Sequence, residues 1–282
     1  MSLINWKYKL FSQQRELMLD EGTNLTVILT VWKRNNLEEQ IEVLLNQTVK
    51  PSQIWIYHCK DYIRISKLLK KYPFVEVFYS SVNLKYFGRH TLAQYVTTTY
   101  TWILDDDIIP SQTWIETCLK ICKANNAIVC RSGRIIPPND FYPGVIKSQI
   151  YLKQHFVGDS KIVDGINICE EDTVVDYGCS SFFFKTEWEK YFWSIWPFTF
   201  QNGEDMHLSA SCKIREDIPT IVPKQTSVEN VGNLKPAYSF DKHASWKKEG
   251  FNAERAGVIK YLIEEKGWQP ILWPKYQNSL SG

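Results

Sequence analysis

Four short apolar runs alternate with segments of helical period in the first part of the chain, and this order constrains the fold most. The runs are residues 25–32, 54–59, 75–79 and 100–104, and they are rich in branched and aromatic side chains. Strands that alternate with helices of about ten residues pair in parallel through right-handed crossovers. The sequence therefore predicts an α/β fold with a mostly parallel central sheet.

The regular alternation fades after the fourth run. We expect a helix near 88–99 before the fourth run and a second helix at 111–123 after it. The expected later elements are a strand at 127–130, an irregular region to about residue 171, a strand at 174–184, a helix that opens within 201–209, a strand at 220–222 and a polar carboxyl-terminal tail.

Three adjacent carboxylates, Asp105, Asp106 and Asp107, follow the fourth run directly. Ligands of open α/β sheets bind beyond the carboxyl ends of the strands. Adjacent acids repel one another, so a divalent cation that holds a phosphate would explain the cluster. Asp is also a favoured helix-capping residue, and the triplet alone leaves capping of the helix at 111–123 equally open.

Composition and charge exclude several classes of protein. The chain of 282 residues has 33 basic and 31 acidic side chains, which argues against a nucleic-acid binder. The sequence contains no apolar run of membrane-spanning length and no signal-peptide pattern, so we expect a cytoplasmic protein without integral membrane association. The seven cysteines form no Cys-x-x-Cys pair, so neither a zinc site nor a redox motif is indicated.

A Glu204-Asp205 pair opens the later helix, about a hundred residues after the acid triplet. With the Asp-x-Asp pattern after the fourth strand, this order resembles glycosyltransferases of the GT-A type. The triplet, Arg134 and the segment 246–252 are similar to the exostosin-like transferases of family 64, and family 2 also fits the amino-terminal half. The resemblance covers about residues 25–265.

The resemblance implies one GT-A domain over residues 1–282 with a Rossmann-like sheet. Residues 25–134 would bind the nucleotide sugar, and the irregular half, 135–265, would bind the acceptor. The implied activity is metal-dependent transfer of a hexosyl or pentosyl group to a glycan hydroxyl. The donor would be a UDP-sugar such as UDP-xylose or a UDP-N-acetylhexosamine, and the cofactor would be Mn²⁺ or Mg²⁺.

The resemblance also implies site residues. Asp107 would bind the ion together with Asp105, and Asp205 would be the base of an inverting reaction, with Glu204 beside it. The implied donor-binding residues are Thr30, Asp61, Arg89, Asp105, Asp106, Arg134, Gly178 and Lys247, and the implied acceptor wall is Trp193, Trp196 and Phe198. Most of the aromatic residues would instead form the core.

Several alternatives stay open at this stage. Asn202 as a helix cap would place Asp205 in a capping box, and in retaining relatives the same pair steadies the sugar. Where relatives have a third metal ligand this chain has Asn230, which leaves His207 and His243 as outside candidates. The alternative functions are a metal-dependent phosphotransferase or phosphatase, and a catalytically silent carbohydrate-binding protein.

Overall fold

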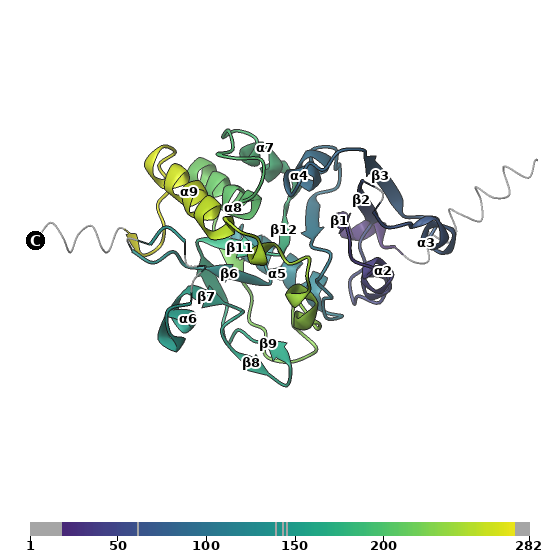
Figure 1. Cartoon of the computed structure of the whole chain (residues 1–282). Helices are drawn as coiled ribbons and strands as arrows, with labels where there is room; N and C mark the ends of the chain where they lie inside the picture. Colours follow the sequence, from purple (N-terminus) through teal and green to yellow (C-terminus); the bar gives the residue numbers. More distant parts are fainter. Residues whose placement is uncertain (1–18, 61, 139, 143, 145, 274–282) are drawn as a thin grey trace, which may run out of the picture.

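A mixed sheet of eight strands runs through the centre of the molecule (Figure 1). The computed structural model describes residues 19–60, 62–138, 140–142, 144 and 146–273. The strands are β1 (Leu25–Val31), β2 (Gln53–Cys59), β3 (Glu76–Ser80), β4 (Tyr100–Leu104), β5 (Ile128–Val129), β10 (Thr173–Val175), β12 (Ser181–Lys185) and β13 (Thr220–Val222). Their order in the sheet is β10-β13-β5-β12-β4-β1-β2-β3.

Most neighbours in this sheet are parallel, as expected. β3, β2, β1 and β4 pair in parallel, and β5 pairs in parallel with β13. β12 lies antiparallel between β4 and β5, and β10 is an antiparallel edge strand. The carboxyl ends of β1 and β4 therefore lie side by side, and the Asp triplet leaves the sheet at this point.

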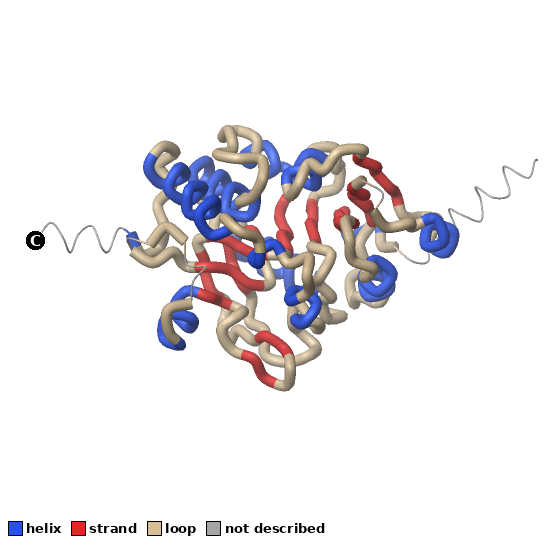
Figure 2. The backbone as a smooth tube through the Cα atoms, viewed as in Figure 1, coloured by secondary structure: helices blue, strands red, loops and turns tan. Residues whose placement is uncertain are grey.

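Helices flank the sheet (Figure 2). They are α2 (Leu37–Leu45), α3 (Ser66–Lys71), α4 (Phe87–Ala93), α5 (Trp114–Asn125), α7 (Glu189–Phe192) and α8 (Glu204–Glu216). β4 is buried along its whole length, with Trp102, Ile103 and Leu104 at 0% exposure. Because both faces of a central strand are covered, a continuous apolar run is favoured there over an alternating pattern.

A smaller sheet and a long helix complete the second half. β6 (Ser132–Arg134) lies between β11 (Tyr177–Cys179) and β7 (Phe156–Val157), and β8 (Ile162–Val163) pairs with β9 (Ile166–Asn167). α9 (Phe251–Glu264) lies beside α8 (Figure 1). The remaining short elements are α6 (Gln149–His155), η1 (Glu21–Thr23), η2 (Thr186–Trp188), η3 (Pro236–Phe240) and η4 (Ser245–Lys247).

The structure corrects three expectations. The strand predicted at 174–184 is divided into β10, β11 and β12, because the chain turns at Asp176 and again at Ser180, which has a φ of 66°. The helix expected to reach residue 99 ends at Ala93, since the β-branched run that follows disfavours helix. The supposed polar tail contains α9, whose Val258, Ile259 and Leu262 pack in a second apolar core.

No helix in the described part of the chain is both long and apolar enough to cross a membrane.

Candidate active site

A cavity of about 810 Å³ lies beyond the carboxyl ends of β1 and β4. One wall comes from β1, β2, α4 and the triplet that follows β4, and another comes from the smaller sheet and the first turns of α8 and α9. The third is the strap, a name we give to residues 233–250. The strap lines the cavity through Pro236, Ser239, Phe240, His243, Ala244, Ser245, Trp246 and Lys248. All three carboxylates of the triplet reach this cavity.

Backbone contacts fix the triplet at the end of β4. The backbone N–H of Asp105 donates to the carbonyl of Ser180 at 3.1 Å. The side chain of Gln40 donates to the carbonyl of Asp105 at 2.7 Å, and that of Asn36 donates to the carbonyl of Asp106 at 3.0 Å. α2 and the residue before it therefore hold the loop in place, which leaves the carboxylates free for other contacts.

The triplet does not cap the following helix. α5 begins at Trp114, and its N-cap residue is Thr113, which makes no side-chain capping bond. The carboxylates of Asp105 and Asp106 contact arginines instead. The capping interpretation that the sequence left open is therefore wrong.

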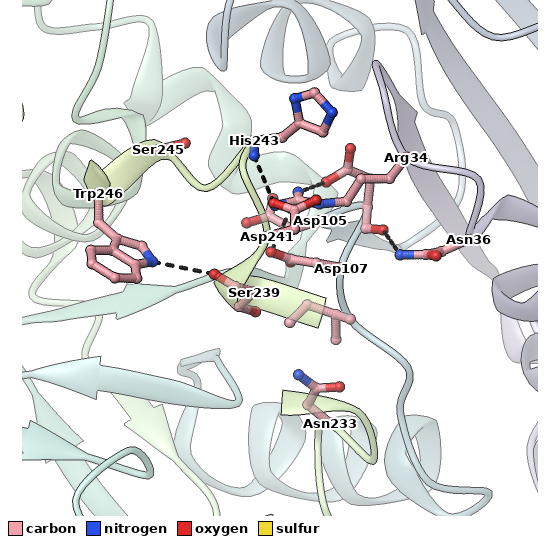
Figure 3. Close-up of polar contacts among 12 residues, drawn as sticks. Arg34, Asn36, Asp105, Asp107, Asn233, Ser239, Asp241, His243, Ser245 and Trp246 are labelled. Carbon is pink, nitrogen blue, oxygen red and sulfur yellow. Dashed lines mark hydrogen bonds and ion pairs between the residues drawn. The ribbon is translucent and has the colours of Figure 1, made fainter. Parts of the chain in front are cut away.

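Arg34, which follows β1, connects the triplet to the strap (Figure 3). Its Nη1 contacts Asp106 and lies 3.4 Å from Oδ2 of Asp107. Its Nε and Nη2 each donate to one oxygen of Asp241 at 2.9 Å. A single guanidinium thus neutralises part of the triplet and fastens the strap over the cavity. Burial nevertheless raises the pKa of Asp106 to about 7.

Arg89 of α4 makes the corresponding link between the triplet and α8. It is 3% exposed, contacts the carboxylate of Asp105, and donates through Nη2 to Oε1 of Glu204 at 2.7 Å. Burial, and then repulsion from Asp205, raise the pKa of Glu204 to about 7. The structure therefore brings together Arg89, Asp105 and Glu204, which the sequence analysis had selected separately.

Asp107 is distinguished within the triplet by a buried carboxylate oxygen that is left without a partner in the described part of the chain. Its Oδ1 is buried and has no hydrogen-bond partner among the residues that the structure describes. Within the same residues, no group of three or more His, Cys, Asp or Glu side chains is arranged to hold a metal. One carboxylate with an unpartnered oxygen still fits Mg²⁺ or Mn²⁺, because such ions take one or two carboxylates and complete their shell with substrate phosphates and water.

Asp205 is held by an arginine that the sequence analysis overlooked. Nη1 and Nη2 of Arg255 lie 3.0 and 2.7 Å from Oδ1 and Oδ2 of Asp205. Oδ1 also accepts the N–H of Met206 at 2.8 Å. Among the described residues Oδ2 accepts a hydrogen bond from Arg255 alone, so Oδ2 keeps a lone pair for another proton. The N-cap of α8 is Gly203, at a φ of 83°, so the Asn202 capping box is wrong.

One end of the cavity carries Thr30, which was expected near the nucleobase. Thr30, Trp32, Tyr57 and Lys85 line it. Oγ1 of Thr30 and Nε1 of Trp32 are buried without a hydrogen-bond partner in the described part of the chain. Asp61, predicted to contact the base, lies outside the described residues. Of the two residues selected from sequence, Thr30 is thus placed in the cavity wall.

Arg134 and Gly178 lie in neighbouring strands of the smaller sheet but differ in position. Arg134 lines the cavity and contacts Asp159 at 2.9 Å. Gly178 does not line it. A Cβ at residue 178 would come within 2.0 Å of Sγ of Cys130, so this glycine permits close packing of β11 against Cys130.

Four further predicted residues do not line the cavity: Lys247, Trp193, Trp196 and Phe198. Nζ of Lys247 donates to the carbonyl of Asp241 at 3.0 Å within the strap, and Nε1 of Trp193 donates to Glu189 at 3.1 Å. The aromatic residues that do line the cavity are Trp32, Tyr57, Tyr86, Tyr142, Phe156, Tyr177, Phe182, Phe240, Trp246 and Phe251.

The two candidate histidines occupy different environments. His207 is 2% exposed, its Nε2 lies 2.9 Å from the carbonyl of Phe192, and burial lowers its pKa to about 4. His243 lies in the strap and lines the cavity. Asn230, at the position where relatives have a ligand, accepts the N–H of Thr226 at 2.9 Å and shapes a turn. Only His243 is therefore placed where a ligand in the cavity could meet it.

Comparison with known proteins identifies the family. The model of glycosyl transferase family 2 matches residues 26–189, which is more than half of the chain. The chain therefore belongs to glycosyl transferase family 2 and is a glycosyltransferase of the GT-A type, so the family 2 likeness drawn from sequence is confirmed. No match is found among curated protein sequences.

Solved structures give more distant likenesses. S. aureus TarS residues 1–349 has 12% identity and a TM-score of 0.45, with 70% of this chain and 57% of that chain covered. A second structure of S. aureus TarS has 12% identity and a TM-score of 0.44, with 70% and 34% covered. The chain thus spans little more than half of the first of these proteins.

Proposed function

We propose that this glycosyltransferase moves a sugar from a UDP-sugar to a glycan hydroxyl and that it needs Mn²⁺ or Mg²⁺. The observation that carries the proposal is the unpartnered Oδ1 of Asp107, which is buried at the carboxyl end of β4 beside a cavity large enough for a nucleotide sugar. A buried carboxylate oxygen without a donor is costly unless a ligand satisfies it. A hard cation carried in with a diphosphate would do so.

Asp107 would hold this cation, and His243 is our candidate for a further ligand from the strap. When bound, the ion would neutralise the charge that develops on the departing diphosphate. Asp105 and Asp106 are already held by Arg89 and Arg34, so their part would be to orient these two arginines and any ion-bound water. The two arginines are outnumbered by the carboxylates of the triplet, Asp241 and Glu204, so a bound cation would still be needed to hold a diphosphate here.

Asp205 is our candidate for the base that takes the proton of the acceptor hydroxyl in an inverting reaction. Arg255 fixes the orientation of its carboxylate, and Oδ2 retains a lone pair for the proton. Glu204 is the second candidate, since burial raises its pKa above the ordinary value of a glutamate and it also lines the cavity. Substitution of each residue separates these roles.

Each half of the single GT-A domain would then bind one of the two substrates. Residues 25–134 would bind the nucleotide, with Thr30 and Trp32 offering unpartnered polar atoms to the base. Residues 135–265 would bind the acceptor. UDP-xylose and UDP-N-acetylhexosamines are the donors that we would test first.

A panel of UDP- and GDP-sugars, incubated with the protein and Mn²⁺ and followed by NMR, tests the proposal. We expect slow hydrolysis of one donor with release of the nucleoside diphosphate, and loss of this activity in Asp107→Ala. With an acceptor present, the anomeric signal would report inversion or retention. Release of inorganic phosphate in place of a nucleoside diphosphate would instead favour a phosphatase, and full activity of Asp107→Ala would contradict the proposal.

A further inference from the structure

Two arginines in the wall of the cavity share a single carboxylate. Nη1 of Arg131 lies 2.8 Å from Oδ1 of Asp159, and Nη1 of Arg134 lies 2.9 Å from Oδ2. Asn167 also donates to Oδ1 of Asp159, at 3.2 Å. All four residues line the cavity. The group therefore carries one more positive than negative charge.

Much of the hydrogen-bonding capacity of the two guanidiniums is unused. The side chain of Arg131 is 8% exposed, and its Nε has no partner among the described residues. Arg134 donates through Nη1 to Asp159 and to the carbonyl of Gly133, and its guanidinium lies over the ring of Phe156 at 4.2 Å. A guanidinium has five N–H groups, so both arginines keep donors for a ligand.

A purely structural role explains this group poorly. One arginine would neutralise Asp159, whereas a second buried guanidinium adds a charge whose desolvation is costly unless another anion compensates it. The carboxylate of Asp107 contributes to the electrostatic environment of Arg131. In the function proposed above, however, Asp107 is committed to the cation. A ligand that brings its own negative charge would supply the missing partner.

We propose that Arg131 and Arg134 form a subsite for an anionic group, a carboxylate, sulfate or phosphate, on the acceptor glycan. This rests on the proposed function, and it assigns Arg134 to the acceptor in place of the donor contact predicted from sequence. The smaller sheet carries Arg134, on the opposite side of the cavity from the base-binding end. Ile146 and Ile162, 54% and 66% exposed, line the cavity near solvent on this side and would leave room for a glycan to enter.

Sulfate binding to the chain of 282 residues tests the subsite without any need for catalysis. Melting temperature is measured against sulfate concentration, with chloride keeping the ionic strength constant. We expect a saturable rise for the wild type, a loss of at least fivefold in affinity for Arg134→Gln, and no change for Arg64→Gln, a matched control at an exposed position. Asp159→Asn should bind sulfate more tightly, because it removes the competing carboxylate.

The opposite outcomes would overturn the proposal. Sulfate affinity that is unchanged in Arg134→Gln, or weakened in Asp159→Asn, would favour a structural network. Should Arg134→Gln fail to fold, Arg134→Lys keeps the charge but loses the forked geometry, and it should weaken sulfate binding by a smaller factor.

A second arm identifies the source of the anion. With saturating UDP and Mn²⁺, the sulfate effect should persist if the subsite serves the acceptor, and it should vanish if the arginines bind the phosphates of the donor. A protein that binds sulfate but not UDP would contradict the proposed function and leave the anionic subsite standing. A protein that binds UDP but not sulfate would contradict only the subsite.

Discussion

The guanidinium of Arg255 contacts both carboxylate oxygens of Asp205, at 3.0 and 2.7 Å, and both side chains are at least nine-tenths buried. α9 thereby fixes a carboxylate at the first turn of α8. The pair connects the stability of the second half of the molecule to the geometry of the proposed base.

Replacing Arg255 should destabilise the fold measurably. In Arg255→Met the buried carboxylate of Asp205 loses its charged partner, and we expect a loss of about 3 kcal/mol in the free energy of unfolding, measured with urea. The double variant Arg255→Met, Asp205→Asn should recover most of this loss, since no unpaired charge remains. A double variant no more stable than the single one would mean that the ion pair is not responsible.

Asp107 should be required for cation binding but not for stability. Asp107→Asn should abolish the proton relaxation enhancement that bound Mn²⁺ produces in the presence of UDP, while the melting temperature stays within a few degrees. Oδ1 of Asp107 has no internal partner to lose, and Arg34, which lies 3.4 Å from Oδ2, keeps Asp106 and Asp241 as partners. Asp217→Asn, a surface substitution at the end of α8, is the matched control. Unchanged Mn²⁺ binding in Asp107→Asn would place the cation elsewhere.

His207 should make stability depend on pH in a defined direction. Its pKa in the folded state is about 4, below the ordinary value of about 6.5, so between these values the unfolded chain binds the additional proton. Stability therefore rises with pH across this window. Relative to His207→Gln, the wild type should lose ~3 kcal/mol in the free energy of unfolding as the pH falls from 7 to 4. Parallel curves would mean that the pKa of His207 is the same in the folded and the unfolded protein.

Aromatic residues of the strap should contribute more to acceptor binding than those selected from sequence. Trp246 lines the cavity at 52% exposure, whereas Trp196 is 74% exposed and lies outside its lining. We expect Trp246→Ala to raise the KM for an identified acceptor about tenfold, or roughly 1.4 kcal/mol, with donor hydrolysis unchanged. Trp196→Ala should leave both unchanged. The reverse result would restore the acceptor wall predicted from sequence.

The apolar pattern of the sequence was sufficient to predict the central parallel strands. The apolar runs at β1, β2 and β4 indicate buried parallel strands, because a strand that is covered on both faces does not alternate between polar and apolar side chains. The region that became β10, β11 and β12 was misread as one strand. The first of its two turns is at Asp176, whose carboxylate accepts the N–H groups of Ile136 and Ile271 from distant parts of the chain.

The sequence by itself determined the α/β order, the acid triplet after β4 and the Glu204-Asp205 pair that opens α8, because each is written in neighbouring residues. Only the tertiary structure decided which arginine serves which carboxylate. Arg34 and Asp241 are separated by 207 positions in the sequence, and Arg255 and Asp205 are separated by 50. The spacing of residues along the sequence does not predict contacts over such separations. Charge pairing in a buried site is settled by which side chains the packed elements bring within reach, and that depends on the whole fold.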